Sequence, residues 1–423
     1  MNQRQFFYLL LLGFLPFLYG LNKNSNRHVN LPNTALVNGK WFNGKVFDEL
    51  TVYSVNGKFT FKKPATIDTT IDLAGLWMIP PFAEAHNHNI GTGLIESDKK
   101  AIQNYLTGGV FYVKIMGNLP ITDSTKNLLR LNEYNSVDVV FAQGNITASG
   151  GHPIRLVEGL LLRGYYPGYT KETLKDFRYF TIDSASELDR KWPTILKLKP
   201  DFIKIIICQS DKFEKIKDDT TIWYKGINPN LIPSIVNKAH REKLKVSAHI
   251  VNAADFHNAL MAGVDEIAHM PRLISGIPYQ PISPGDAKEA ARRRVTVITT
   301  DAISLFQGGS IKPSDFPEAK KIQSADLKLL YENGVSIAIG SDDPTDNSVK
   351  EVFYLKDLGV FDNLNLIKIW TENTPKAIFP NRKIGALREG YEANFIALEG
   401  NPVDDLNNVR KIKFRFKNGR LLN

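Results

Sequence analysis

The sequence reads Ile79-Pro80-Pro81-Phe82-Ala83-Glu84-Ala85-His86-Asn87-His88-Asn89 at the end of an apolar run that begins at Leu76. On a β-strand, side chains alternate between the two faces, so His86 and His88 point the same way from one strand end. Two imidazoles held close together on a rigid edge provide half of a divalent metal site. The pattern also fits a strand that exposes two polar residues, so the rest of the chain has to supply the remaining ligands.

From Trp77 to about Pro375, apolar runs alternate with amphipathic helical stretches. Eight runs are predicted to be strands: Met78–His86, Val110–Met116, Val139–Gln143, Phe202–Cys208, Leu244–His249, Glu266–Ala268, Val295–Thr299 and Val335–Gly340. The helices expected between them include Ser97–Leu106, Ile232–Arg241, Ala253–Ala262, Pro284–Arg293, Gln323–Asn333 and Leu364–Glu372. This alternation favours an α/β fold in which a parallel sheet closes into a (β/α)8 TIM barrel. An open doubly wound sheet is the alternative, but no Gly-x-Gly-x-x-Gly turn follows a strand.

Short strands and turns flank this region on both sides. Residues 28–76 contain the pairs Asn38-Gly39 and Asn56-Gly57, which are strong hairpin signals because both residues tolerate positive φ. Similar signals return in residues 385–423. Each region is too small to bury a sheet face alone. We therefore predict that they pair into one small β-sandwich domain beside a barrel that spans residues 77–384.

The composition is that of an ordinary globular protein. The chain has 423 residues, of which 43% are hydrophobic and 23% charged, which is enough for a large barrel and a smaller domain. The net charge is +9, but Lys and Arg are spread along the whole sequence and no nucleic-acid module is recognisable. We expect a small-molecule substrate as the partner, no nucleic acid, and leave a homo-oligomer open.

Residues 1–20 resemble an export signal, with Arg4 near the start and an apolar stretch from Phe6 to Leu18. That stretch is shorter than the roughly 20 residues that span a membrane. Because Leu18-Tyr19-Gly20 is a poor cleavage site, an uncleaved N-terminal membrane anchor is the alternative. We expect a periplasmic or secreted protein, with no stable membrane partner if the leader is removed. The only cysteine is Cys208, so no internal disulfide can form.

In barrel enzymes the site lies at the C-terminal ends of the strands. Polar residues fall on or after six of the eight predicted strands: His86 and His88, His152, Lys204, His249, His269 and Asp342. This concentration predicts a single site at one mouth of the barrel.

The ordered set resembles the amidohydrolase superfamily of metal-dependent hydrolases, close to its imidazolonepropionase-like and Xaa-Pro dipeptidase-like branch. That family carries His-x-His after strand one, a lysine on strand four, single histidines after strands five and six, and an aspartate after strand eight. The likeness extends to the closing segments Thr371–Ala377 and Ile384–Gly390. The chain departs from the pattern at Pro81, Glu84 and Asn394, none of which is a metal ligand.

The resemblance implies two divalent metal ions, with Zn²⁺ as the preferred metal. His86, His88 and Asp342 would hold one ion, and His249 and His269 the second. Asp342 would also act as the proton shuttle of the reaction.

Lys204 needs a separate argument, because an ammonium group has no lone pair for a metal. It lies between Ile203 and Ile205, and burial there lowers the pKa of a lysine. A neutral amine can take up carbon dioxide, and the resemblance implies that the resulting carbamate bridges the two ions. A surface lysine whose ammonium group reaches solvent is the ordinary alternative, which the flanking isoleucines disfavour.

His152 and Tyr224 are candidates for substrate binding. His152 ends the glycine-rich segment Thr147–His152, where it either binds the substrate carbonyl or carboxylate or holds the segment in place. Tyr224 lies in the loop after the fourth strand. The loops Arg155–Thr181 and Gln209–Asn230 are expected to set specificity.

The expected function is hydrolysis of an amide bond in a small substrate, such as an Xaa-Pro dipeptide or an N-acyl amino acid, by metal-activated hydroxide. One alternative keeps the fold and changes the reaction to lactone or phosphoester hydrolysis, or to deamination of a ring. Another is an exported metal- or nutrient-binding protein without activity. Asp342 argues against the last, because binding alone needs no proton shuttle.

Overall fold

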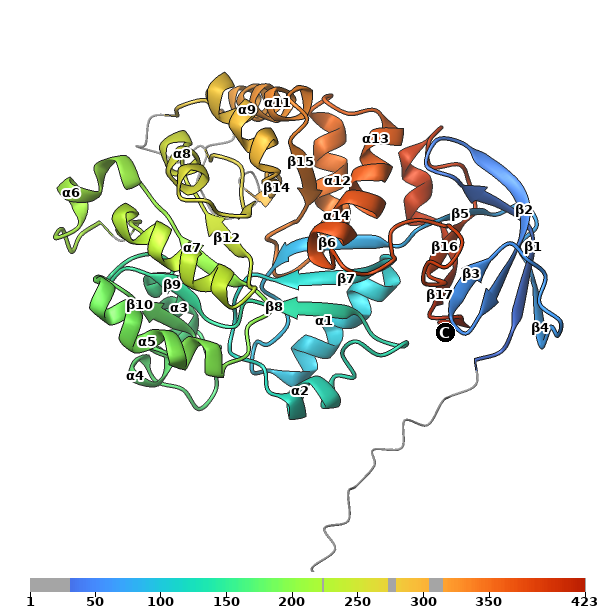
Figure 1. Ribbon diagram of the computed structural model, residues 1–423, viewed down its shortest axis with the longest axis horizontal. Helices are drawn as coiled ribbons and strands as arrows, with labels where there is room; N and C mark the ends of the chain where they lie inside the picture. Colours follow the sequence, from blue (N-terminus) through green and yellow to red (C-terminus); the bar gives the residue numbers. More distant parts are fainter. Residues whose placement is uncertain (1–30, 223, 273–278, 304–314, 423) are drawn as a thin grey trace, which may run out of the picture. The chain divides into compact units, whose positions relative to one another are not determined.

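The computed structural model describes residues 31–222, 224–272, 279–303 and 315–422. From Leu31 onward the chain forms one compact unit, which contains a barrel and a separate β-sheet (Figure 1). The predicted export signal at residues 1–20 lies outside the described residues.

The separate sheet is built from both ends of the chain. Its strands are β1 (Thr34–Phe42), β2 (Phe47–Val55), β3 (Lys58–Thr60), β4 (Thr69–Asp72), β5 (Trp77–Ile79), β16 (Phe395–Leu398), β17 (Ile412–Lys417) and β18 (Arg420–Leu421). Strand β5 joins the two ends, because it pairs with β1 on one side and with β16 on the other. The ring of Trp41 packs edge-on against Phe59 and Phe395, at 5.9 Å and 5.2 Å between ring centroids. The two terminal regions therefore come together, as predicted, but they form one eight-stranded sheet and not the two packed sheets of the predicted β-sandwich.

The barrel strands coincide with the predicted apolar runs. They are β6 (Phe82–Asn87), β7 (Val110–Ile115), β8 (Asp138–Phe141), β11 (Ile203–Ile206), β12 (Val246–His249), β13 (Glu266–Ile267), β14 (Thr296–Thr299) and β15 (Ser336–Ile339). Parallel ladders run from β6 through β8 and from β11 through β15. Nearly all of these strand residues are buried, as expected for strands covered on both faces. The predicted α/β barrel is confirmed.

The predicted strand Met78–His86 is in fact two strands. Pro80 and Pro81 lie between β5 and β6, and a proline lacks the N–H that a ladder requires. The break lets β5 belong to the separate sheet while β6 opens the barrel.

The third barrel strand is also interrupted. After β8, Gln143 adopts a left-handed conformation with φ of 61°, and the chain resumes as β9 (Asn145–Thr147). Strand β9 pairs with β11 on one side and with β10 (Tyr179–Thr181) on the other. Strands β9 and β10 were not predicted. They lie in the chain between β8 and β11, and they extend the sheet of β11–β15 by two strands.

Helices follow the strands around the barrel (Figure 1). They are α1 (Ile95–Thr107), α2 (Asp123–Leu128), α3 (Ile154–Leu162), α4 (Lys171–Leu174), α5 (Ala185–Lys197), α6 (Phe213–Ile216), α7 (Ile232–Arg241), α8 (Ala253–Met261), α9 (Pro284–Arg293), α11 (Phe316–Glu332), α12 (Ser348–Asp357), α13 (Asn363–Lys368) and α14 (Thr374–Ile378). Helix α8 begins at a capping box between Asn252 and Asp255. The predicted helix Leu364–Glu372 is α13 continued by a π-helical turn, Ile369–Asn373, whose Trp370 stacks on Phe82 at 3.5 Å.

Glu84 joins the last barrel strand to the first. Its carboxyl accepts the backbone N–H of Ser341 at 2.8 Å and the Ser341 hydroxyl at 2.7 Å. The backbone N–H of Asp342 donates to the His86 carbonyl at 2.8 Å. Gly340 has no room for a side chain, since a Cβ there would lie 2.5 Å from the Cβ of His86. The carboxyl is fully buried, and burial raises the pKa of Glu84 to about 8.

We expect Glu84→Ala to lower the free energy of unfolding by about 3 kcal/mol or more, because it leaves two buried donors of Ser341 unpaired. Glu84→Gln, which keeps the shape and stays neutral, should cost much less.

The ordinary pKa of the glutamate is 4.5, so the folded state alone holds its proton between pH 4.5 and about 8. The contribution of Glu84 to the free energy of unfolding of the wild type therefore falls as pH rises through this window. In Glu84→Gln, the free energy of unfolding should depend less on pH. Denaturant unfolding of the wild type and both variants at pH 5 and pH 8 measures these free energies. An equal pH dependence in the wild type and Glu84→Gln would contradict the raised pKa of Glu84.

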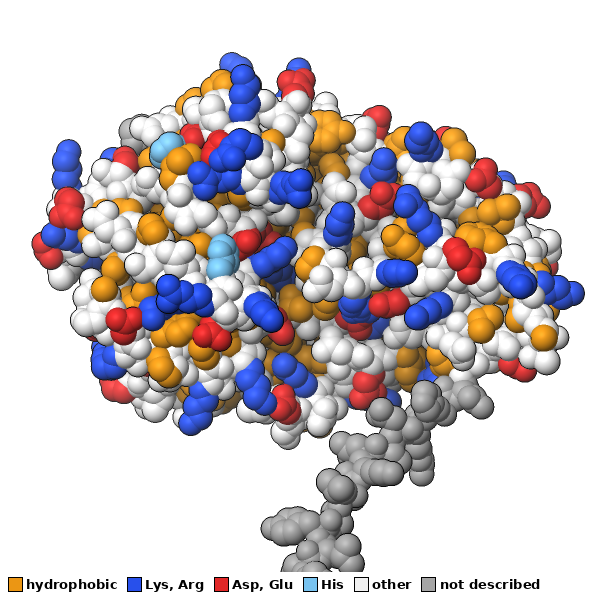
Figure 2. Space-filling model, in the orientation of Figure 1, with side chains coloured by type: hydrophobic (Ala, Val, Ile, Leu, Met, Phe, Trp, Pro, Cys, Tyr) orange, Lys and Arg blue, Asp and Glu red, His pale blue; other side chains and the backbone are white. Residues whose placement is uncertain are grey.

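The charged surface is mixed. Figure 2 shows Lys and Arg side chains scattered over one face of the molecule, with Asp and Glu among them. Among the described residues, no helix combines the length and the apolar character needed to span a membrane.

Candidate active site

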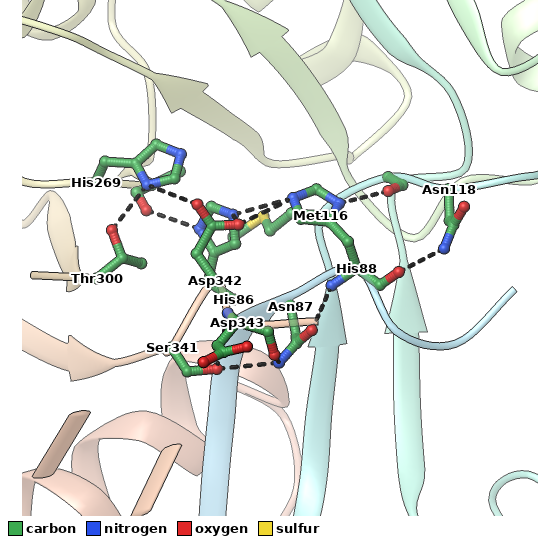
Figure 3. Close-up of polar contacts among 12 residues, drawn as sticks. His86, Asn87, His88, Met116, Asn118, His269, Thr300, Ser341, Asp342 and Asp343 are labelled. Atoms are coloured by element: carbon green, nitrogen blue, oxygen red, sulfur yellow. Dashed lines mark hydrogen bonds and ion pairs between the residues drawn. The ribbon is translucent and has the colours of Figure 1, made fainter. Parts of the chain in front are cut away.

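Two neutral histidines stand at the end of β6. Nδ1 of His86 lies 2.8 Å from the Ala268 carbonyl oxygen, and Nδ1 of His88 lies 2.5 Å from that of Gly117. Each Nδ1–H therefore donates to a carbonyl, which leaves the Nε2 lone pair facing the site (Figure 3). Burial lowers the pKa of His86 well below 6.5 and that of His88 to about 4. Both rings are neutral at pH 7, as metal ligation requires.

Asp342 completes a close triangle with these histidines. The two Nε2 atoms lie 3.3 Å apart, and each lies 3.4 Å from Oδ1 of Asp342. Ligand atoms at about 2.0–2.1 Å from a tetrahedral Zn²⁺ are separated by about 3.3–3.4 Å. Asp342 itself adopts a left-handed backbone conformation with φ of 51°, uncommon for a residue with a side chain, which places it at the turn after β15.

The two later histidines lie beside this triangle. The ring of His269 is 4.3 Å from that of His86 and 4.5 Å from that of His249. Ligand atoms of His86, His269 and Asp342 all lie within 4.8 Å of one another. Burial lowers the pKa of both His249 and His269, and Nε2 of His249 is buried without a hydrogen-bond partner.

Lys204 is inside the barrel on β11. The residue is 1% exposed, and its Nζ has no hydrogen-bond partner. Burial lowers the pKa of Lys204 to about 7, so that much of the amine is neutral at physiological pH. The side chain does not reach solvent, which excludes the surface alternative.

The candidate substrate residues also reach the histidines. The ring of His152 lies 4.9 Å from that of His249 and 5.1 Å from that of Tyr224. Burial lowers the pKa of His152 to about 3, so this imidazole is neutral as well. The two side chains form one wall beside His249.

Two arginines at the site were not predicted from the sequence. Nη2 of Arg272 lies 2.8 Å from Oδ2 of Asp342 and 2.8 Å from Nδ1 of His269. Nη2 of Arg178 donates to the Gly117 carbonyl at 3.2 Å, which is the same carbonyl that accepts from His88. Arg272 lies three residues after His269, which is a weak signal. Nothing in the sequence marks Arg178, which precedes a strand that was also missed.

The residues present fit a divalent metal ion. All six predicted ligands gather at one end of the barrel, the imidazoles are neutral, and nitrogen and carboxylate oxygen are ligands that Zn²⁺ accepts. The buried Lys204 Nζ and His249 Nε2 have no hydrogen-bond partner among the described residues, and an ion or a group bound to it would supply one.

Sequence comparison finds similarity over part of the chain. Residues 223–422 match the model of the amidohydrolase family. An ochratoxinase from Aspergillus niger is 27% identical over 221 residues, which cover 48% of this chain and 44% of the ochratoxinase. The matched part thus spans less than half the length of this relative.

Structure comparison extends the likeness to nearly the whole chain. The crystal structure of A. niger ochratoxinase has a TM-score of 0.72 at 18% identity, over 93% of this chain and 96% of the other. A Xaa-Pro dipeptidase with methionine bound in its active site has a TM-score of 0.70 at 18% identity, over 92% and 99%. Molinate hydrolase has a TM-score of 0.68 at 15% identity, over 93% and 95%. At these identities the structures show a shared fold. Residues 223–422, just under half of the chain, therefore match the amidohydrolase family, and nearly the whole chain shares the barrel fold of these hydrolases.

Proposed function

We propose that the protein hydrolyses the amide bond of a small substrate, such as an Xaa-Pro dipeptide or an N-acyl amino acid, with two divalent metal ions, preferably Zn²⁺. The observation that carries the proposal is the triangle of His86, His88 and Asp342, with ligand atoms 3.3–3.4 Å apart beside a buried, unpartnered Lys204. The fold shared with a Xaa-Pro dipeptidase supports this substrate class. The leader sequence supports action after export.

His86, His88 and Asp342 would hold one ion, and His249 and His269 the other, with a carbamate on Lys204 between them. When bound, such ions lower the pKa of a water molecule and polarise the substrate carbonyl. Arg272 contacts both His269 and Asp342 through Nη2. A second ion would therefore bind His269 through Nε2, or through Nδ1 after the guanidinium moves away.

Asp342 is placed to move the proton. Its carboxylate faces both Nε2 atoms, and its side chain is 17% exposed, so it reaches solvent and substrate. The Arg272 guanidinium donates a hydrogen bond to Oδ2 of this carboxylate at 2.8 Å and holds it in place. Asp342 therefore accepts a proton from the attacking water and donates it to the leaving nitrogen. His152 and Tyr224 bind and orient the substrate from the wall beside His249.

We expect the purified, metal-loaded protein to hydrolyse members of a panel of Xaa-Pro dipeptides and N-acyl amino acids. A chelator such as EDTA should abolish turnover, and Zn²⁺ should restore it, because the water needs the ion to reach a usable pKa. The panel includes lactones, phosphoesters and amino-substituted rings as controls. Turnover of those compounds alone would replace the proposal, and amide hydrolysis that survives complete metal removal would contradict it.

A further inference from the structure

Arg178 is a buried cation without an anion. The residue is 5% exposed, and both Nε and Nη1 are buried without a hydrogen-bond partner. Its Nη2 donates only to the carbonyl of Gly117. Among the described residues, no carboxylate lies within ion-pair distance of this guanidinium. Because an arginine stays protonated in proteins, it cannot relieve the cost of burial by losing its charge.

Three other buried or half-buried cations of this chain, Lys114, Lys417 and Arg382, have carboxylate partners. Lys114 lies 2.6 Å from Glu266, and Lys417 lies 2.6 Å from Asp138. Arg382 contacts both Asp138, at 2.7 Å, and Glu392, at 2.6 Å. A buried charge is tolerated when it is paired and hydrogen-bonded. The contrast indicates that the partner of Arg178 comes from outside the chain.

The position of Arg178 shows where this partner would lie. The Gly117 carbonyl accepts both from Arg178 and from Nδ1 of His88, so the guanidinium is one carbonyl away from a predicted metal ligand. Arg272 adds a second positive charge next to His269 and Asp342, and Asp342 already neutralises it. An anion that enters the site therefore finds Arg178 as a guanidinium without a carboxylate partner among the described residues.

We propose that Arg178 binds a carboxylate of the substrate and so selects amides of amino acids over neutral amides. This inference rests on the proposed function, because it names the part of the substrate that the protein recognises. Nε and Nη1 offer N–H donors to the carboxylate oxygens while Nη2 stays on Gly117. Holding the carboxylate there anchors the amide beside His86, His88 and Asp342.

The first test is thermal unfolding without any substrate. Arg178→Met keeps the apolar length of the side chain and removes the unpaired charge, so we expect its melting temperature to rise by about 2–4 °C. Arg382→Met is the matched control, because it leaves Asp138 and Glu392 without their arginine partner, and its melting temperature should fall. Acetate should raise the melting temperature of the wild type more than that of Arg178→Met, and acetamide should not distinguish them.

The second test compares N-acyl amino acids with the corresponding carboxamides, which differ only in the charged group. Arg178→Met should lower kcat/KM for the carboxylate compounds by about 10–100-fold, mainly through KM, because hydrogen bonds to a charged group are lost. It should leave the carboxamides nearly unchanged, and Arg178→Lys should restore part of the preference.

The proposal is overturned if Arg178→Met loses stability as Arg382→Met does while the ratio of carboxylate to carboxamide hydrolysis stays the same. It is also overturned if acetate protects both proteins equally. If the wild type hydrolyses no amide of the panel, the proposed function fails, and the melting temperatures with acetate still decide whether Arg178 binds a carboxylate.

Discussion

Asp342→Asn is expected to cut turnover by about a hundredfold or more while leaving most of the metal in place. The amide keeps an oxygen where Oδ1 of the carboxylate lies 3.4 Å from both histidine Nε2 atoms, so one ligand position is preserved. It cannot accept and return a proton near neutral pH, and general acid–base help is worth about 10²–10⁴-fold. Measurement of kcat together with elemental analysis separates the two effects.

Asp343→Asn is the matched control. Asp343 is the next residue, but its carboxylate pairs with Lys350 at 2.9 Å and accepts from Thr345, away from the histidines. This variant should keep turnover within a few fold of the wild type. Near-normal activity in Asp342→Asn, or an equal loss of activity in both variants, would contradict the assignment of Asp342 as the proton shuttle.

Lys204→Ala should give the largest loss of metal. The lysine is buried inside the barrel, and its Nζ has no hydrogen-bond partner in the part of the chain that the structure describes. Burial lowers its pKa to about 7, which makes the neutral amine available for carbamate formation. Without that anionic bridge, four neutral imidazoles and one carboxylate have to hold two doubly charged ions. We expect metal content to fall below one ion per chain and activity to be lost.

A small carboxylate tests the reason for that loss. Acetate or formate fits the space left by the lysine side chain and supplies the missing anionic oxygens, so metal content and part of the activity should return. Acetamide has a similar size without the charge and should not rescue. If Lys204→Ala keeps the wild-type metal content, the carbamate is not part of the site.

The barrel could be predicted because its strands are buried on both faces. Runs such as Val110–Met116 and Phe202–Cys208 are apolar except for one lysine each, Lys114 and Lys204, and each contains a strand of the structure. The pairing of both chain ends also followed, because neither region could bury a face alone, although they form one sheet and not the predicted sandwich.

The errors have local causes. Pro80 and Pro81 divide one apolar run between two sheets, which the hydrophobic pattern cannot show. The strands β9 and β10 have three residues each, too short for a periodic signal. Helix α5 was not predicted, and it contains Pro193. Helices α3, α4 and α6 lie in segments predicted to be loops.

The site residues also separate into those that the sequence could predict and those that it could not. His86, His88, His249, His269 and Asp342 could be named because barrel topology brings strand ends together. Arg178 and Arg272 could not, because their guanidinium groups reach the site from loop positions along long side chains. Their role follows from what they contact, and in the case of Arg178 from the carboxylate that it lacks.

The most direct test of the central proposal is the metal content of purified wild-type protein, measured by elemental analysis after exchange into metal-free buffer with Zn²⁺ supplied beforehand. The proposed site, in which six side chains would hold two ions, predicts a value near two per chain, and a value near zero for a variant in which both His86 and His88 are replaced by Ala. A wild-type protein that retains no divalent metal, or a double variant that retains as much as the wild type, would contradict the account.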